Sequence, residues 1–239
     1  MIIINCEQRT EDWYRLRAGN PGASNVDKII TTKGEISKQR EDFLLQMAGE
    51  KITGWPEESF TSFAMQQGID KEAEARALFE LATGLDVEQV GLIFKDDRRL
   101  FHASPDGLAG GRPLEIKCPT IKTQVKYLLG GALPSEYYGQ CQMHLYVTGA
   151  DEMYFASYYP GLPLFLITHK PHPGYQRALG AALEQFSRDL AQVVLKLQTL
   201  TDTLPNPEKL NSEPLVKPAG CSEGVCETCK KALICKEKP

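Results

Sequence analysis

Two carboxylates and a lysine lie close together in the middle of the chain, where Pro105-Asp106 is followed by Glu115-Ile116-Lys117. Gly110 and Gly111 between them predict a tight turn, so that the two segments pair as a β-hairpin. Hydrolysis of a phosphodiester needs a water in line with the leaving oxygen and compensation of charge on the phosphoryl oxygens, and Mg²⁺ can provide both. These residue types therefore indicate a metal-dependent nuclease.

Each residue of this group has a place in that chemistry. Mg²⁺ prefers a few carboxylates together with waters and substrate oxygens, so Asp106 and Glu115 are suitable ligands and the Ile116 carbonyl is placed to complete the shell. Lys117 shares a strand face with Glu115, where an ammonium would orient the attacking water. The alternative is a surface hairpin with scattered charges. Apolar flanks such as Leu114 favour the site, because charges beside a core need partners.

Polar residues on two predicted helices are further candidates. Glu72 is either a site residue or an exposed glutamate that pairs with Arg76 one helical turn away. Gln140 and Gln142 lie among apolar residues, where an amide needs a partner. That partner is either a phosphate or base edge, or a backbone group in the core.

The elements that must position these residues follow from the periodicity of the apolar side chains. Helices are predicted at 11–19, 24–30, 37–52, 63–82, 121–130, 136–147 and 174–200. Strands are predicted at 87–94, 99–108, 112–118, 153–159 and 164–169. This order predicts an α/β (α+β) fold in which helices flank a mixed central β-sheet. Four prolines between 205 and 218 predict a boundary between a domain at 1–204 and a linker with a tail at 205–239.

Composition limits the class of protein. A chain of 239 residues is long enough for one substantial core and an appendage. No apolar run approaches the roughly 20 residues that span a bilayer, and the N-terminus lacks the pattern of a secretory signal, so we expect a cytoplasmic protein without membrane contact. The net charge of −4 argues against a large exposed nucleic-acid surface but allows a local basic groove.

The tail contains four closely spaced cysteines, Cys221, Cys226, Cys229 and Cys235. Four thiolates at such spacing can bind Zn²⁺ or an iron–sulfur cluster. The alternative is a flexible tail with reduced or adventitiously paired thiols.

Five blocks of sequence occur in an order that is specific for one family. They are Trp13–Arg17 with Ala23-Ser24, Gly68–Phe79, Ala103–Leu108, Leu114–Pro119 and Tyr138–Gln142. Together they resemble the phage lambda exonuclease family, also called the YqaJ-type viral recombinase nucleases, whose fold is restriction-endonuclease-like with a PD-(D/E)xK motif. The Cys-rich tail departs from this pattern.

The resemblance implies a Mg²⁺-dependent enzyme, with Mn²⁺ as a substitute, that degrades one strand of linear double-stranded DNA from 5′ to 3′. It would leave a 3′ overhang, form a homotrimeric ring and work beside a single-strand annealing protein in recombination. Two alternatives remain: a metal-dependent endonuclease of the same superfamily, and a non-catalytic DNA-binding protein.

The resemblance also assigns residues. Asp106, Glu115 and the Ile116 carbonyl would bind the metal, while Lys117 would activate the water. Glu72 would help to place the water or the metal, and Met65 would wedge apart the terminal base pair. The terminal 5′-phosphate would meet an arginine fork with hydroxyl and amide donors, a set that suits a phosphate monoester. These donors are Arg17, Ser24, Ser104 and Gln140.

Overall fold

The computed structural model describes the backbone of residues 1–57 and 63–203 and the side chains of residues 1–57 and 71–200. The helices are α1 (Glu11–Arg17), the 3₁₀ helix η1 (Ala23–Lys28), α2 (Arg40–Thr53), α3 (Phe63–Thr83), α4 (Ile121–Gly130), α5 (Ser135–Thr148) and α6 (Pro173–Thr203). The strands are β1 (Ile2–Ile4), β2 (Val87–Glu88), β3 (Leu92–Phe94), β4 (His102–Ala103), β5 (Gly107–Ala109), β6 (Arg112–Lys117), β7 (Met153–Ser157) and β8 (Phe165–His169). Contacts divide the chain into a unit Met1–Leu197 and a second unit that begins at Gln198.

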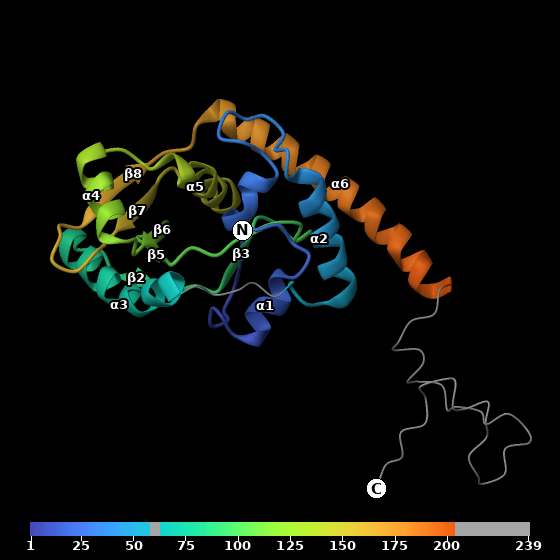
Figure 1. The fold of residues 1–239 in the computed structure, drawn as a ribbon, viewed down its shortest axis with the longest axis horizontal. Coiled ribbons are helices and arrows are strands. Elements are labelled where there is room, and N and C mark those ends of the chain that lie inside the picture. The colour runs from blue at the N-terminus through green and yellow to red at the C-terminus, as the bar shows by residue number, and fades with distance from the viewer. Residues whose placement is uncertain (58–62, 204–239) are drawn as a thin grey trace, which may run out of the picture. The chain divides into compact units, whose positions relative to one another are not determined.

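A mixed sheet of five strands forms the centre of the first unit, in the order β2-β5-β6-β7-β8. Strands β6 and β7 are parallel, and the other neighbours in this sheet are antiparallel. A parallel pair needs a crossover connection, and α4 and α5 provide it (Figure 1). The mixed α/β architecture predicted from the sequence is therefore confirmed.

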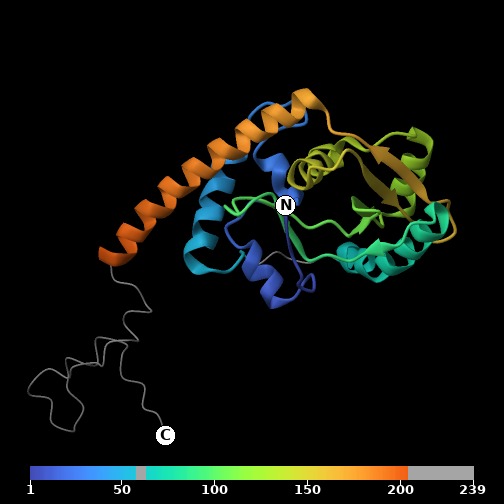
Figure 2. The ribbon, with the colours of Figure 1, turned by 180° about the vertical axis from the view of Figure 1, so that it is seen from behind.

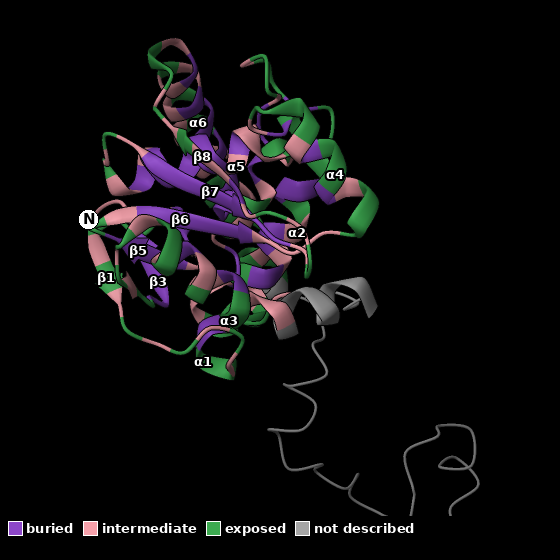
Figure 3. Ribbon diagram, turned by 90° about the vertical axis from the view of Figure 1, so that its left-hand side faces the viewer, coloured by how far each residue is buried: buried purple, intermediate pink, exposed green. Residues whose placement is uncertain are grey.

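Helices cover both faces of this sheet (Figure 3). On one face, Leu114 and Ile116 of β6 pack with Ala75 and Phe79 of α3. On the other face, Cys141 and Leu145 of α5 pack with residues of β7 and β8. Residues two apart on a strand share a face, so Glu115 and Lys117 lie on the α5 side of the sheet.

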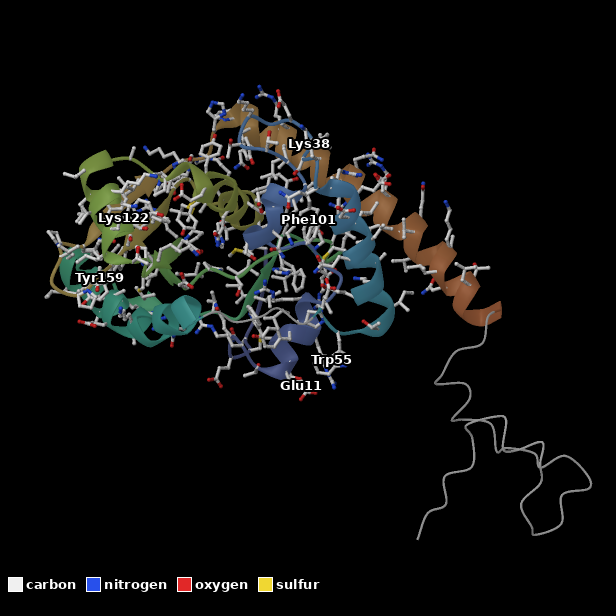
Figure 4. The ribbon with its side chains drawn as sticks, in the orientation of Figure 1. Glu11, Lys38, Trp55, Phe101, Lys122 and Tyr159 are labelled. Atoms are coloured by element: carbon white, nitrogen blue, oxygen red, sulfur yellow. The ribbon has the colours of Figure 1, made fainter. Side chains whose placement is uncertain are left out.

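A second, antiparallel sheet has the order β1-β3-β4. The N-terminus, next to which β1 begins, is marked in the view from behind (Figure 2). Trp13 of α1 packs against Leu92 and Phe94 of β3. Phe101, labelled in Figure 4, precedes β4 and is buried in the largest core cluster together with Phe43 of α2. This arrangement places α1 and β4 beside the start of β5.

Three details differ from the elements predicted from the sequence. The run at 99–108 is not one strand but β4 and β5, which lie in different sheets. Pro105 has no N–H for a ladder, so the chain leaves the first sheet there. The run at 87–94 likewise divides into β2 and β3, and β1 was not anticipated. The helix predicted from Ser24 is the short η1, which begins at Ala23 without a side-chain cap.

In the part of the chain that the structure describes, no helix has the length and apolar character needed to cross a bilayer. The four tail cysteines at 221, 226, 229 and 235 lie outside the described residues, so their metal site stays a prediction.

Candidate active site

The hairpin brings Asp106 beside Glu115. Strands β5 and β6 pair with Gly107 opposite Leu114, and the Asp106 amide donates to the Leu114 carbonyl at 3.0 Å. The Ile116 amide donates to Asp106 Oδ2 at 2.6 Å. Gly107 also lets β2 pack closely against β5, because a Cβ there would lie 2.3 Å from a Val87 methyl. The two carboxylates predicted as ligands therefore lie at one end of the hairpin.

Glu115 is buried and held by three donors. Lys117 Nζ and Gln140 Nε2 bond to its Oε1, the latter at 2.7 Å. His144 Nε2 lies 2.9 Å from Oε2. Gln140 and His144 are one turn apart on α5, so they reach the carboxylate from the same helix face. The orientation of Glu115 is thus fixed from both β6 and α5.

The charges in this group are strongly coupled. Burial and the nearby charge of Glu115 raise the pKa of Asp106 well above its usual range. Burial alone would also raise the pKa of Glu115, but Lys117 and His144 outweigh it and lower that pKa. The pKa of Lys117 is raised, because the attraction of Glu115 and Asp106 exceeds the effect of its own burial. A cation placed between the carboxylates would relieve their repulsion.

The backbone of β6 supplies a third oxygen at this point. The Lys117 carbonyl faces β7, where it accepts from the Tyr158 amide at 2.9 Å. Backbone groups of successive strand residues point to opposite edges, so the Ile116 carbonyl faces the Asp106 side, as its amide does. The described side chains contain no group of three or more His, Cys, Asp or Glu arranged to hold a metal. Two carboxylates and one carbonyl fit Mg²⁺, which retains several waters.

A cavity of about 150 Å³ opens beside the carboxylates. All four residues predicted to bind a 5′-phosphate line it, and so does Asp106. Its lining is Gln8, Arg9, Trp13, Arg17, Ala23, Ser24, His102, Ser104, Asp106, Gln140 and His144. Residues from the N-terminal segment, β4 and α5 thus meet in one place, although they are far apart in the sequence.

Arg17 is one of the two guanidiniums that, among the described residues, line this cavity. Its guanidinium stacks over the Trp13 ring at 3.9 Å and donates from Nη2 to Ser24 Oγ at 3.4 Å. Burial lowers the pKa of Arg17 to about 10, so the side chain is charged at neutral pH. A partly desolvated guanidinium whose visible partner is a neutral hydroxyl favours an incoming anion.

Ser104 and Gln140 already have partners. The Ser104 hydroxyl donates to the Gly91 carbonyl at 2.6 Å and accepts from Trp13 Nε1 at 3.1 Å. Gln140 donates to Glu115. To donate to a phosphate, the Ser104 hydroxyl would have to rotate, whereas the Gln140 amide still has a second hydrogen. Gln142 is engaged in the core, where it contacts His169, the Lys170 carbonyl and the His172 amide.

Glu72 lies near Asp106, since its charge contributes to raising the pKa of that carboxyl. Both of its oxygens are paired, Oε1 with Arg76 and Oε2 with Arg9, each at 2.7 Å. The ion pair with Arg76, which the sequence offered as one alternative for Glu72, is present. Arg9 adds a second guanidinium. Met65 lies in the first turn of α3, and its side chain is outside the described residues.

Sequence reasoning missed several residues of the site. Gln8 donates to the Pro105 carbonyl at 2.9 Å and so fixes the loop before Asp106. His102 and His144 are buried, and each has an Nδ1 without a partner among the described atoms. The spacing of His144 from Gln140 could have indicated a shared helix face. His102 gave no such signal, because its position depends on the pairing of β3 with β4.

The fold and the carboxylate pair define a class of protein, the restriction-endonuclease-like nucleases. Residues 12–151 match the family described as the YqaJ-like viral recombinase domain. The match covers more than half of the chain, and the chain belongs to this family.

Solved structures agree with this assignment. The LHK-Exo structure in complex with dAMP is 30% identical, with a TM-score of 0.73, and the match covers 82% of this chain and all of that one. The structure of alkaline exonuclease LHK-Exo from Laribacter hongkongensis is 29% identical over the same shares, also with a TM-score of 0.73. A phage-related exonuclease from Haemophilus somnus 129PT shares the fold at 12% identity and a TM-score of 0.56, over 74% of this chain and 96% of that one. Among curated proteins no match is found.

Proposed function

We propose that this protein is a Mg²⁺-dependent exonuclease that digests one strand of linear double-stranded DNA from 5′ to 3′ and leaves a 3′ overhang. The observation that supports this most directly is the single cavity that joins Arg17 and Ser24 to Asp106. A 5′-phosphate bound by the first two residues would bring the next phosphodiester to the carboxylates. LHK-Exo has been crystallised with dAMP, a mononucleotide of the kind that such an arrangement would release.

The reaction exchanges one P–O bond for another. The oxygen of a water bonds to phosphorus, and the bond from phosphorus to the 3′ oxygen of the terminal nucleotide breaks. One proton leaves the water, and one proton is gained by the 3′ oxygen. The products are a 5′-mononucleotide and a strand with a new 5′-phosphate, which is again a ligand for Arg17. Because each cleavage creates a new 5′-phosphate, the nuclease can act repeatedly from the same end.

Asp106, Glu115 and the Ile116 carbonyl would hold the Mg²⁺ ion, and Mn²⁺ would occupy the same oxygen ligands. When bound, the cation supplies charge compensation for the phosphoryl and leaving oxygens. Lys117, which Glu115 fixes in place, orients the water and stabilises its deprotonated form. Gln140 and His144 keep the Glu115 carboxylate in one orientation, and Glu72 supports the site from α3.

Incubation with Mg²⁺ and two DNA substrates tests this function. Linear duplex and covalently closed circular duplex of the same sequence are compared on gels. We expect the linear DNA alone to be degraded, with a strand-specific 5′ label released first. Cutting of the circle would instead favour the endonuclease, and binding without cleavage of either substrate would favour a DNA-binding protein.

We further propose that the enzyme acts as a homotrimeric ring beside a single-strand annealing protein, in the cytoplasm of a bacterial host. A chain of net charge −4 gains little from general attraction to DNA, so encirclement would keep it on its substrate. Mass measurement in solution tests the ring. A monomer at micromolar concentration, with processivity unchanged on dilution, would contradict it.

The tail is proposed to hold Zn²⁺ or an iron–sulfur cluster through its four cysteines. Anaerobically purified protein should then contain near-stoichiometric zinc or iron, and deletion of residues 205–239 should remove the metal and leave the nuclease folded. Protein that contains neither metal would favour an unliganded tail.

A further inference from the structure

Arg9 has a backbone conformation that arginine rarely adopts. Within the described ranges, two non-glycine residues have a positive φ, Arg9 at 67° and Arg99 at 51°. The neighbours of Arg9 impose it: Gln8 is bonded to the Pro105 carbonyl at 2.9 Å, and Thr10 caps α1. A left-handed residue other than glycine persists only where its surroundings determine it. The chain thus keeps a guanidinium at a point where glycine would suit the backbone better.

Glu72, which forms an ion pair with Arg9, has a second cationic partner. Arg9 Nη2 lies 2.7 Å from Glu72 Oε2, and Arg76 Nη2 lies 2.7 Å from Glu72 Oε1. The Arg9 side chain is 42% exposed, whereas that of Arg76 is 15% exposed and one turn away on the same helix. Arg9 can therefore leave Glu72 without leaving a buried carboxylate uncompensated.

Arg9 also lines the cavity that contains Asp106 and Arg17. Arg9 and Arg17 lie at opposite ends of α1, and a helix of this length spans about 10 Å. Arg17 is beside Ser24, whereas Arg9 is beside Glu72, whose charge acts on Asp106. The two guanidiniums therefore face different parts of the cavity.

We propose that Arg9 is a second phosphate-binding residue, which exchanges Glu72 for the phosphodiester lying over Asp106 when DNA enters. This rests on the proposed function and makes it more specific: Arg17 would bind the terminal monoester and Arg9 the diester next to it. A phosphodiester presents two charged oxygens to the planar guanidinium, as the Glu72 carboxylate does. The competing explanation is that Arg9 only supports Glu72.

Arg9→Gly separates these explanations. It removes the guanidinium and leaves a residue that accepts a positive φ, so loss of binding cannot be attributed to backbone strain. Arg99→Gly is a matched control, because Arg99 also has a positive φ and its guanidinium lies over the Phe94 ring, outside the cavity lining. Glu72→Gln and the double variant Arg9→Gly with Glu72→Gln complete the set.

The measurement is affinity for linear duplex DNA between 50 and 200 mM salt, on 5′-phosphorylated and 5′-hydroxyl ends, with Ca²⁺ in place of Mg²⁺ and gels to verify intact DNA. Each phosphate contact contributes about one to the slope of log affinity against log salt. We expect Arg9→Gly to lower the slope by about one and the affinity about tenfold on both ends, with or without Glu72→Gln. Arg99→Gly should match the wild type.

Two results would overturn the inference. An unchanged slope in Arg9→Gly would mean that Arg9 acts only through Glu72. A loss confined to 5′-phosphorylated ends would place Arg9 in the terminal phosphate site. Failure of the proposed function is distinguishable, because in the Mg²⁺ cleavage assay the wild type itself would then cut the closed circular duplex or leave the linear duplex intact.

Discussion

The two sheets contribute different kinds of residue to one site. From the five-stranded sheet come Asp106, which lines the cavity, and Glu115, which donors on β6 and α5 fix. From the side of the three-stranded sheet come Arg17 and Ser24, which lie on α1 and η1. The first group is positioned by strand register, the second by contacts between side chains.

This difference indicates that the two groups of residues serve different steps, the first cleavage and the second recognition of the DNA end. Register within a sheet is rigid, because a slip of one residue turns every side chain to the other face. Such rigidity suits groups that must surround a metal and a reacting phosphorus. A stacked arginine such as Arg17 on Trp13 can adjust to ends that differ in base and fraying. We therefore expect substitutions in the two groups to affect different steps.

The largest effect is expected from removing a carboxylate. Asp106→Ala and Glu115→Ala each remove a proposed metal ligand and should abolish cleavage of linear duplex, while DNA binding is partly retained because Arg17 is untouched. Gel assays with Mg²⁺ and filter binding with Ca²⁺ measure the two properties. If either variant cleaves at more than a few per cent of the wild-type rate, the assigned ligand set is wrong.

Removal of the lysine should affect the chemical step alone. Lys117→Ala leaves the metal ligands in place, so we expect Mg²⁺ to bind and kcat to fall by at least about 10², the scale of one lost preorganised electrostatic group. Lys117→Arg should not restore the rate, since a planar guanidinium does not replace a compact ammonium. Single-turnover digestion at saturating Mg²⁺ measures this. A near wild-type rate for Lys117→Ala would refute the role.

On the recognition side, Arg17→Ala should reduce digestion of 5′-phosphorylated ends far more than of 5′-hydroxyl ends. Hydrogen bonds to charged groups contribute about 1.5–3 kcal/mol, which corresponds to a difference of about 10- to 100-fold. Competition between the two ends in one reaction gives the ratio directly. Equal losses on both ends would show that Arg17 contributes to structure or contacts another phosphate.

The sequence predicts the parts of the site that depend on neighbouring residues, but not the parts that depend on contacts between distant segments. The hairpin from Asp106 to Lys117 follows from two glycines and adjacent polar residues, so the pairing of its two segments could be predicted. The break at Pro105 between two sheets could not, because it depends on pairing of β4 with β3. The pairing of Glu72 with Arg9 joins residues 63 positions apart, and no periodicity indicates such a contact.

The smallest effect is expected at His144, which lines the cavity and bonds to Glu115 but is not itself a proposed metal ligand. Nε2 of this buried imidazole lies 2.9 Å from Glu115 Oε2. Loss of a partner that orients a metal ligand typically costs 10–100-fold in metal affinity. For His144→Ala we expect about a tenfold rise in the Mg²⁺ concentration for half-maximal activity, with kcat at saturating Mg²⁺ changed much less.

A control separates this orienting role from a packing role. His144→Gln keeps an N–H donor on the same face of α5 and should recover most of the Mn²⁺ affinity measured by calorimetry without DNA, whereas His144→Leu fills the space but has no donor. The outcome that contradicts the prediction is equal Mn²⁺ affinity in the Gln and Leu variants. In that case Lys117 of β6 and Gln140 of α5 would suffice to orient Glu115, and His144 would contribute only packing.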